Sequence, residues 1–208
     1  EAASWLAGTQ QVASAAATPS DPALEALVRV YMDGDRAEAR RRLERALSEH
    51  SDRDAYWLLL AGMGYDMGDG EVLRRCLDQM RAMGKEWPNL LVLLGRHAWN
   101  QGDQESARRF LERAAVLRGG DAQLQELLLQ LDLSEGDLKR AEHRVRRLLS
   151  MDPNHVAANL ALARILEAQK RPDLAEAALR HVLAQGLQVD ALSELAALLE
   201  KRDVLDEG

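Results

Sequence analysis

An all-α fold, built as an array of antiparallel helix pairs, is the fold class that this sequence predicts. A Gly-Asp dipeptide recurs at an interval of 34 residues, with its glycine at Gly34, Gly68, Gly102 and Gly136. On both sides of each dipeptide the apolar residues recur every three and four positions, which is the period of an α-helix. Aromatic residues make up only 4% of the chain, whereas the good helix formers Leu, Ala, Arg and Glu are abundant. Together these observations predict an α-solenoid of repeated helix pairs.

The Gly-Asp dipeptide predicts the end of one helix and the start of the next. Glycine accepts the positive φ that closes a helix without a Cβ penalty. The aspartate that follows can accept hydrogen bonds from the free N–H groups of the next helix and suits the positive end of its dipole. We therefore interpret the dipeptides as turns and not as catalytic or phosphate-binding loops. The aspartates are Asp35, Asp69, Asp103 and Asp137.

Each predicted helix carries its core positions at fixed distances from the turn glycine. The fifth residue after the glycine is alanine in most units, and a small side chain there lets two helices approach closely. The ninth residue after it is aliphatic in every unit, and the eighth residue before it is always apolar. We expect all of these residues to be buried. They are Ala39, Leu73, Ala107, Ala141 and Ala175, then Leu43, Leu77, Leu111, Val145 and Leu179, and finally Ala26, Leu60, Leu94, Leu128 and Leu162.

Counting in both directions from the turns places five helix pairs in residues 20–187. The predicted units are 20–53, 54–87, 88–121, 122–155 and 156–187. Residues 1–19 are expected to form a helix, interpreted as the second helix of a truncated preceding repeat. Residues 188–208 are expected to form a capping helix and an acidic tail, because four leucines share one face of that helix. These leucines are Leu192, Leu195, Leu198 and Leu199.

The repeat resembles the tetratricopeptide repeat, a 34-residue unit of two antiparallel helices with preferred residue types at several positions. The matching positions are Leu94-Gly95, Gly102-Asp103, Ala107, Leu111 and Ala114 in the third unit, Trp57 in the second and Pro153 in the fourth. The fifth unit departs from the pattern, because Lys170 and Arg171 replace Gly-Asp. The resemblance covers about residues 20–187. It implies a right-handed superhelix of about five repeats with a C-terminal capping helix, of the kind found in bacterial scaffold proteins.

The resemblance also implies that the first helices of successive units line a concave groove for a peptide or partner protein. Three residues before the turn glycine, this face carries an aromatic ladder of Tyr31, Tyr65 and Trp99. The groove is expected to be apolar and aromatic in the first three units and more polar in the later ones. Alternatively, the aromatic residues only fill space between adjacent helices. The predicted groove residues are Val28, Tyr31, Leu58, Gly62, Tyr65, Val92, Arg96, Trp99, Asn100, Gln130 and Arg164.

Arginine pairs recur at the same interval on the second helices and predict a basic ridge on an acidic protein. A ridge of this kind could dock an acidic partner. Alternatively, the arginines pair with carboxylates four residues earlier on a solvated helix face, as Glu38 can with Arg42. The ridge residues are Arg40, Arg41, Arg74, Arg75, Arg108 and Arg109.

Composition and motifs exclude several classes of function. A net charge of −7 and a pI near 5.3 argue against nucleic acids and anionic membranes, which attract basic surfaces. No apolar run reaches the roughly 18 to 20 residues that a membrane span needs. The five histidines are dispersed, and no common catalytic, nucleotide-binding or metal-binding motif is present. We therefore predict no catalysis, cofactor or metal site, and we interpret the single cysteine, Cys76, as a small apolar filler.

Residues 62–70, with the sequence GMGYDMGDG, have a glycine content that suggests a nucleotide-binding loop. No strand precedes them, and the third glycine of that fingerprint is missing. By repeat register Gly62 and Gly64 lie inside a helix, where glycine costs about 1 kcal/mol relative to alanine. We expect a close contact with a neighbouring helix to compensate for this cost.

The sequence therefore predicts a non-catalytic scaffold that binds a peptide or protein, within a bacterial cell-envelope assembly or export machine. Two alternatives remain: a regulatory or substrate-recruiting domain of a larger enzyme, and a module that self-associates through its exposed repeat ends. The chain begins at Glu1 without a methionine, so we expect a processed form or a piece of a longer protein. The expected compartment is a bacterial periplasm or cytoplasm, with the periplasm favoured.

Overall fold

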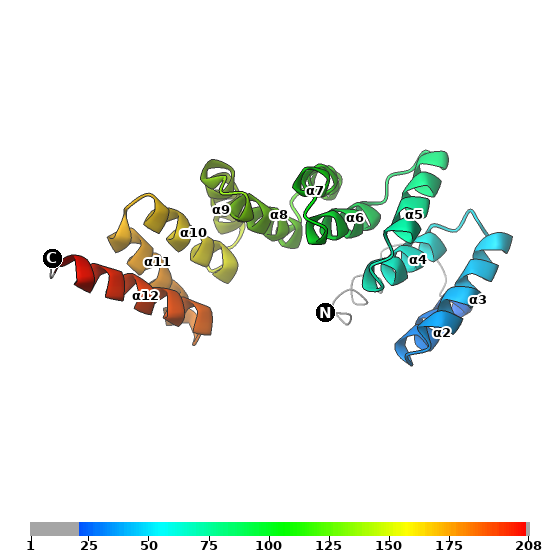
Figure 1. Cartoon of the computed structure of the whole chain (residues 1–208), viewed down its shortest axis with the longest axis horizontal. Coiled ribbons are helices and arrows are strands. Elements are labelled where there is room, and N and C mark those ends of the chain that lie inside the picture. The colour runs from blue at the N-terminus through cyan, green and yellow to red at the C-terminus, as the bar shows by residue number, and fades with distance from the viewer. Residues whose placement is uncertain (1–20, 207–208) are drawn as a thin grey trace. The chain divides into compact units, whose positions relative to one another are not determined.

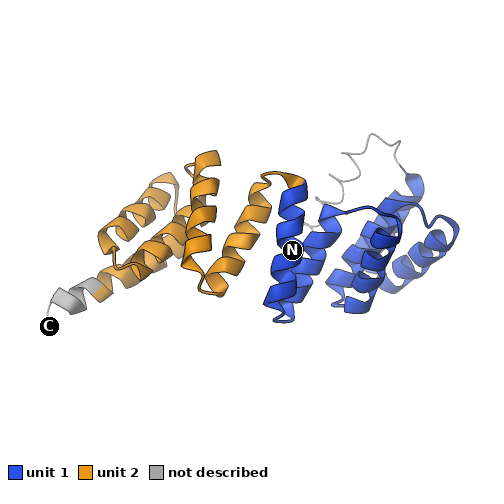
Figure 2. Ribbon diagram, turned by 90° about the horizontal axis from the view of Figure 1, so that it is seen from above, with its two compact units in different colours: residues 1–117 blue, residues 118–208 orange. Residues whose placement is uncertain are grey.

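The computed structural model describes residues 21–206, and every secondary-structure element in this range is an α-helix (Figure 1). The predicted all-α repeat fold is confirmed. The chain divides into two compact units, residues 1–117 and 118–208, which Figure 2 colours separately. The helix expected in residues 1–19 and the end of the acidic tail lie outside the described residues. None of the described helices combines the length and the apolar character that crossing a membrane requires.

In the first unit, each helix packs against the next one in the chain, and the first helices of successive pairs also contact one another. The contacts between α2 and α4 and between α4 and α6 therefore align one row of first helices. The helices are α2 (Pro22–Met32), α3 (Arg36–Glu49), α4 (Asp54–Asp66), α5 (Gly70–Ala82), α6 (Pro88–Asn100) and α7 (Gln104–Arg118).

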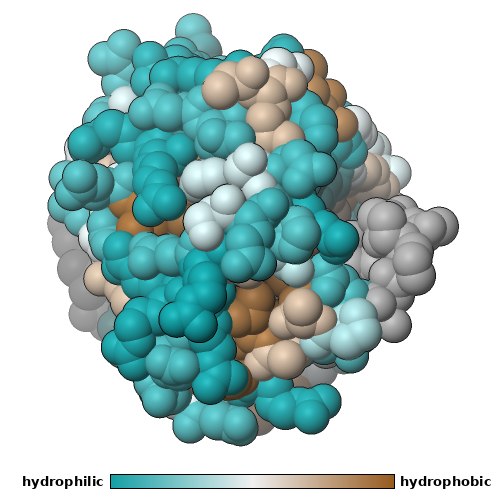
Figure 3. Space-filling model, turned by 90° about the vertical axis from the view of Figure 1, so that its right-hand side faces the viewer, coloured by the Kyte–Doolittle hydropathy of each residue, from teal (hydrophilic) through white to brown (hydrophobic). Residues whose placement is uncertain are grey.

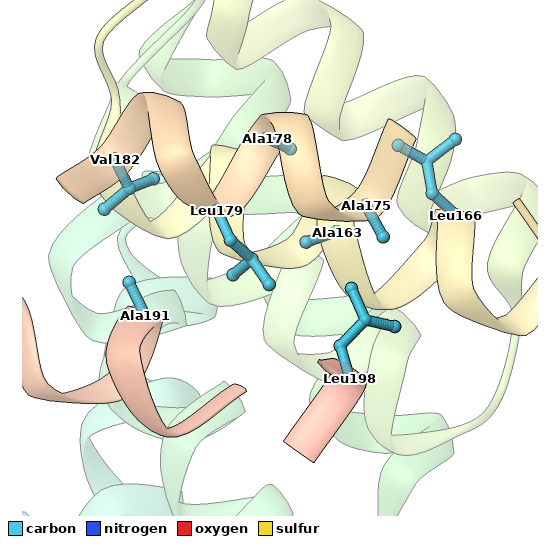
Figure 4. Close-up of a cluster of buried hydrophobic side chains, with 8 residues drawn as sticks. All are labelled: Ala163, Leu166, Ala175, Ala178, Leu179, Val182, Ala191 and Leu198. Carbon is cyan, nitrogen blue, oxygen red and sulfur yellow. The ribbon is translucent and has the colours of Figure 1, made fainter. Parts of the chain in front are cut away.

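In the second unit, two helix pairs are followed by a single long helix. The helices are α8 (Ala122–Ser134), α9 (Leu138–Met151), α10 (Val156–Ala168), α11 (Pro172–Gln185) and α12 (Val189–Asp206). Ala191 and Leu198 of α12 are buried in a cluster with side chains of α10 and α11, including Leu179 and Val182 (Figure 4). Helix α12 therefore covers the last pair. Leu192, predicted on its buried face, is 42% exposed.

The four Gly-Asp turns have the predicted conformation. The turn glycines have φ values of +94°, +67°, +79° and +73° in chain order, a region that other residues rarely adopt. In all four turns the aspartate side chain accepts a hydrogen bond from the backbone N–H three residues later, at 3.0 to 3.1 Å. Each dipeptide thus ends one helix and begins the next, as the sequence predicts.

Small residues let the two helices of a pair approach closely. A Cβ atom added to Gly95 on α6 would lie 2.6 Å from Cγ of Leu111 and 3.2 Å from the carbonyl oxygen of Ala107, both on α7. Likewise, a Cβ on Gly64 would lie 2.7 Å from Cγ1 of Val72 on α5. The close contact expected for the glycines inside a helix is therefore present at Gly64.

Nearly all of the predicted core positions are buried. The positions five and nine residues after the turn glycine are 0 to 8% exposed in all five units. Position eight before the glycine is less uniform, because Ala26 on α2 is exposed and Leu162 on α10 is half-buried.

The turn between α10 and α11 holds a lysine in the conformation that glycine adopts in the other four. Lys170 has a φ of +59°, the only positive φ of a non-glycine residue in the described part of the chain. A side chain in this region crowds the following carbonyl oxygen. Arg171, at the position of the capping aspartates, makes no side-chain hydrogen bond to the start of α11.

Replacing Lys170 by glycine is expected to stabilise the protein by about 1 kcal/mol, because the backbone strain of the turn is removed. The measurement is the urea midpoint followed by far-UV circular dichroism. Lys170→Ala is the matched control, since it removes the charge but keeps the Cβ atom. An equal gain from both substitutions would show that the charge, and not the backbone, is unfavourable at this turn.

Candidate partner-binding surface

Most of the predicted groove residues lie on the aligned first helices of the first unit. Val28 and Tyr31 are on α2, Leu58, Gly62 and Tyr65 on α4, and Val92, Arg96, Trp99 and Asn100 on α6. Gln130 and Arg164 lie in the second unit, on α8 and α10. The structure therefore supports one continuous row only within the first unit.

Tyr31 is a packing residue rather than an accessible one. Its ring is 5% exposed, and its hydroxyl donates a hydrogen bond to the carboxylate of Asp66 on α4. Burial and this hydrogen bond raise the pKa of Tyr31 well above its ordinary value. The guanidinium of Arg36 lies 5.7 Å from the centre of the ring. At this position the aromatic side chain fills space between helices and ties α2 to α4.

Tyr65 and Trp99, the other two members of the aromatic ladder, are partly exposed. The guanidinium of Arg96 on α6 lies 5.5 Å from the centre of the Tyr65 ring on α4, within the range of a cation–π contact. Arg96 is exposed and forms no ion pair with any described residue. Its charge is therefore held in place by an aromatic ring and remains available to a carboxylate.

Half-buried aliphatic side chains complete the accessible part of this surface. Val28, Leu58 and Val92 present part of their side chains to solvent, on α2, α4 and α6 in turn. Gly62 is buried, while Asn100 at the end of α6 is exposed. We call the set Val28, Leu58, Tyr65, Val92, Arg96 and Trp99 the α2–α4–α6 row. Figure 3 looks onto the side of the molecule where α2 and α3 lie, and shows hydrophobic surface between hydrophilic side chains there.

The predicted basic ridge is largely neutralised by the protein's own carboxylates. Arg40 binds Glu44 and Asp69, each at 3.1 Å. Arg41 binds Glu38 at 2.7 Å, and the hydrogen bonds that Glu38 receives lower the pKa of its carboxyl. Arg40 and Arg41 therefore agree with the alternative interpretation, in which the ridge arginines pair with carboxylates on a solvated helix face.

The remaining ridge arginines are less uniform. Arg108 pairs with Glu112 at 3.4 Å, and Arg75 lies 3.9 Å from Glu44 and stacks over a tryptophan ring. Arg109 lies over the ring of the neighbouring Phe110. Arg74 is exposed, and no ion pair joins it to another described residue. The structure therefore does not place six free cations side by side.

A buried polar cluster in the second unit was not predicted. Asp132 on α8 is fully buried and accepts a hydrogen bond from Nε of Arg144 on α9. Nη1 of Arg144 also donates to Oε1 of Gln125, at 3.3 Å, and Gln125 is itself only 3% exposed. The repeat register could have indicated this cluster. Gln125 stands at the position of Trp57 and Asp132 at that of Ala98, and these two equivalent residues are buried. Polar residues at core positions of a repeat are expected to form hydrogen bonds with one another.

The environment of the single cysteine indicates a structural role. Cys76 is fully buried, and burial raises the pKa of its thiol to about 12, so it stays protonated near neutral pH. Its role as an apolar filler agrees with this environment. In the range that the structure describes, no three His, Cys, Asp or Glu side chains come together as metal ligands would.

Comparison with known proteins identifies the fold. Residues 132–201 match the sequence profile of the Tetratricopeptide repeat family. No curated protein matches the sequence. Among solved structures, the chain is similar to PilF from Pseudomonas aeruginosa, with 18% identity, a TM-score of 0.68, and coverage of 88% of this chain and 85% of that one.

Two further solved structures are similar over most of their length. One is YrrB, described as a TPR protein with an unusual peptide-binding site, with 15% identity, a TM-score of 0.65, and coverage of 94% of this chain and 97% of that one. The other is PilW, described as a widely conserved type IV pilus biogenesis factor, with 16% identity, a TM-score of 0.65, and coverage of 89% and 88%. At these identities the similarity concerns the fold.

Proposed function

We propose that this chain is a tetratricopeptide repeat scaffold without catalytic activity, which binds a peptide or protein segment on its first unit. The match of residues 132–201 to that family's profile and the similarity of the fold to solved structures support this proposal. The observation that carries this proposal is the α2–α4–α6 row, in which aliphatic and aromatic side chains on three aligned helices stay partly accessible. A protein that buried these side chains for its own stability would leave less of them in contact with water.

The chemistry of the row indicates the kind of segment that it would bind. The accessible aliphatic side chains favour apolar side chains of a partner, and Tyr65 and Trp99 are of the residue types that contribute most to binding energy at interfaces. Arg96, held over Tyr65, would pair with a carboxylate of the same segment. An extended or helical peptide with apolar residues and an acidic residue satisfies both requirements. The description of YrrB as having a peptide-binding site supports this use of the fold.

The cellular setting is part of the same proposal. The description of PilW as a pilus biogenesis factor, together with the similarity to PilF, favours a bacterial cell-envelope assembly or export machine. Two other roles remain alternatives: a regulatory or substrate-recruiting domain of a larger enzyme, and self-association through the exposed repeat ends.

A pull-down with a double variant tests the role of the row. Tyr65→Ala combined with Trp99→Ala is expected to reduce the capture of a partner by at least about tenfold, because truncating two central aromatic residues removes several kcal/mol at most interfaces. Captured proteins are quantified by mass spectrometry against the unaltered chain. Both side chains are partly exposed, so the fold is expected to persist, which the thermal midpoint checks.

The matched control combines Val116→Ala with Leu174→Ala. These side chains are 70% and 44% exposed and lie outside the row, so the control removes exposed apolar surface elsewhere. It is expected to capture the same proteins as the unaltered chain. If the Tyr65→Ala and Trp99→Ala variant captures them equally well, the row does not bind the partner.

A further inference from the structure

We propose that the second unit carries a separate binding surface for an acidic segment of a partner protein. The surface consists of the first turns of α9 and the turn between α10 and α11. It contains the cations Lys139 on α9 and Lys170 and Arg171 in the turn, together with His143 on α9, and we call these four residues the α9 basic surface. The proposal goes beyond the row on the first unit, since none of its residues belongs to that row.

A shallow pocket on α9 is the first observation. It has a volume of about 280 Å³ and is lined by Lys139, Arg140, His143 and Arg144. Arg140 is paired with Asp137 at 3.0 Å, and Arg144 is engaged in the buried polar cluster. Lys139 and His143 are exposed, and neither pairs with a described residue. The positive charge of Lys139 therefore lies at the pocket without an ion pair to any described carboxylate.

The turn between α10 and α11 is the second observation. Where the other turns have a glycine and a capping aspartate, this turn has two exposed cations, Lys170 and Arg171. The lysine is held in the left-handed conformation, and the arginine leaves the start of α11 without a side-chain cap. Both departures cost stability. Conformational strain of this kind persists most often where a residue has a function.

The two parts of the surface are neighbours. Nε2 of Gln169, directly before Lys170, lies 3.5 Å from Oε2 of Glu142 on α9. Leu138, directly before Lys139, packs against a core cluster that includes Ile165 of α10. The cations of α9 and of the turn therefore lie on adjoining elements of one compact unit.

Carboxylates near this surface are already engaged, with one exception. Glu142 pairs with Arg146, Asp137 pairs with Arg140, and Glu135 has a partner of its own. The exception is Asp173, in the first turn of α11. An excess of positive charge remains, on a chain whose net charge is −7.

The distribution of charge favours an acidic peptide over a nucleic acid. The net negative charge of the chain repels a long polyanion, whereas a short acidic segment interacts mainly with the local field of the surface. Cations spread over two elements suit several carboxylates along a chain better than a single compact phosphate. The occupant that we infer is therefore a glutamate- or aspartate-rich segment of a protein.

Binding of a fluorescein-labelled peptide of alternating glutamate and glycine tests this inference. The full chain is titrated against the peptide and fluorescence anisotropy is measured, at low salt and again at about 0.5 M NaCl, where exposed charges are screened. Lys139→Gln combined with Lys170→Gly is expected to weaken binding by about tenfold, since two attractive charges are lost. The control, Arg29→Gln combined with Arg45→Gln, removes the same charge from exposed positions on α2 and α3 and is expected to change binding by less than about twofold.

Lys170→Gly alone separates binding from folding. If the lysine is retained for binding, the substitution raises stability and lowers affinity for the peptide. A rise in stability with unchanged affinity would overturn the inference, as would equal losses in the double variant and the control. Displacement of the peptide by inorganic phosphate, beyond the effect of NaCl at equal ionic strength, would assign the surface to phosphate instead. The Tyr65→Ala and Trp99→Ala variant is expected to bind the peptide normally, so failure of either proposal is recognised separately.

Discussion

Replacing Arg144 by alanine is expected to destabilise the second unit by about 2–3 kcal/mol, because a buried carboxylate loses a charged hydrogen-bond donor. The carboxylate of Asp132 is fully buried and is bound by the guanidinium of Arg144. Without that guanidinium, the buried carboxylate loses a charge-assisted hydrogen bond, which reduces stability. Gln125 loses a hydrogen bond as well.

The location of the aromatic residues makes this loss measurable. Every Trp, Tyr and Phe of the chain precedes residue 118, so tryptophan fluorescence reports the first unit only, whereas far-UV circular dichroism reports both. We expect the urea midpoint of Arg144→Ala to fall when it is followed by circular dichroism. Hydrogen exchange of α8 and α9 should rise in parallel, because these helices share the cluster.

A double replacement provides the control for the buried pair. Asp132→Leu combined with Arg144→Leu removes both charges and leaves apolar side chains in their place, so it is expected to cost less than about 1.5 kcal/mol or to stabilise the protein. If the double variant is as unstable as Arg144→Ala, the loss comes from packing and not from the broken ion pair.

Leu111→Ala is expected to destabilise the first unit by about 2–5 kcal/mol, because a fully buried leucine is replaced by a smaller side chain that leaves a cavity. Leu111 is 0% exposed and lies where Gly95 of the facing helix has no Cβ atom. The two helices already touch through Gly95, so their backbones have little room to close the space. The measurement is the urea midpoint followed by tryptophan fluorescence.

Val116→Ala is the matched control on the same helix. Val116 is 70% exposed, so its truncation is expected to change stability by less than about 0.5 kcal/mol. A small effect of Leu111→Ala, comparable to that of the control, would contradict the packing of α6 on α7 described above.

The core of each helix pair could be predicted from the sequence because repetition made the pattern visible. A single Gly-Asp dipeptide has many interpretations, but four of them at equal spacing, each flanked by apolar residues at helical intervals, leave only a turn between two helices. The repeat boundaries that follow from this counting remain a prediction. Ala26 departs from the pattern, since it is exposed whereas the equivalent leucines of the next three units are buried.

The candidate binding surface could be predicted only in part. The spacing placed Tyr31, Tyr65 and Trp99 on one helix face, but it could not separate the aromatic ring that is buried from the two that stay accessible. That difference depends on Asp66, which lies 35 positions away and accepts a hydrogen bond from Tyr31. Predicting which ridge arginines are paired likewise required the positions of distant carboxylates, such as Asp69 beside Arg40.

The sequence by itself determined the helical repeat, its turns and most of its buried positions, because these depend on residues a few positions apart. Only the tertiary structure decided which charges are paired, which aromatic rings are accessible, and that Asp132 and Arg144 meet inside the second unit. These outcomes depend on distances between side chains of different helices, and sequence spacing along one helix carries no information about them. Lys170 required both kinds of information. The repeat register indicated an unusual turn, and the backbone dihedral angle showed that the strain lies at this residue.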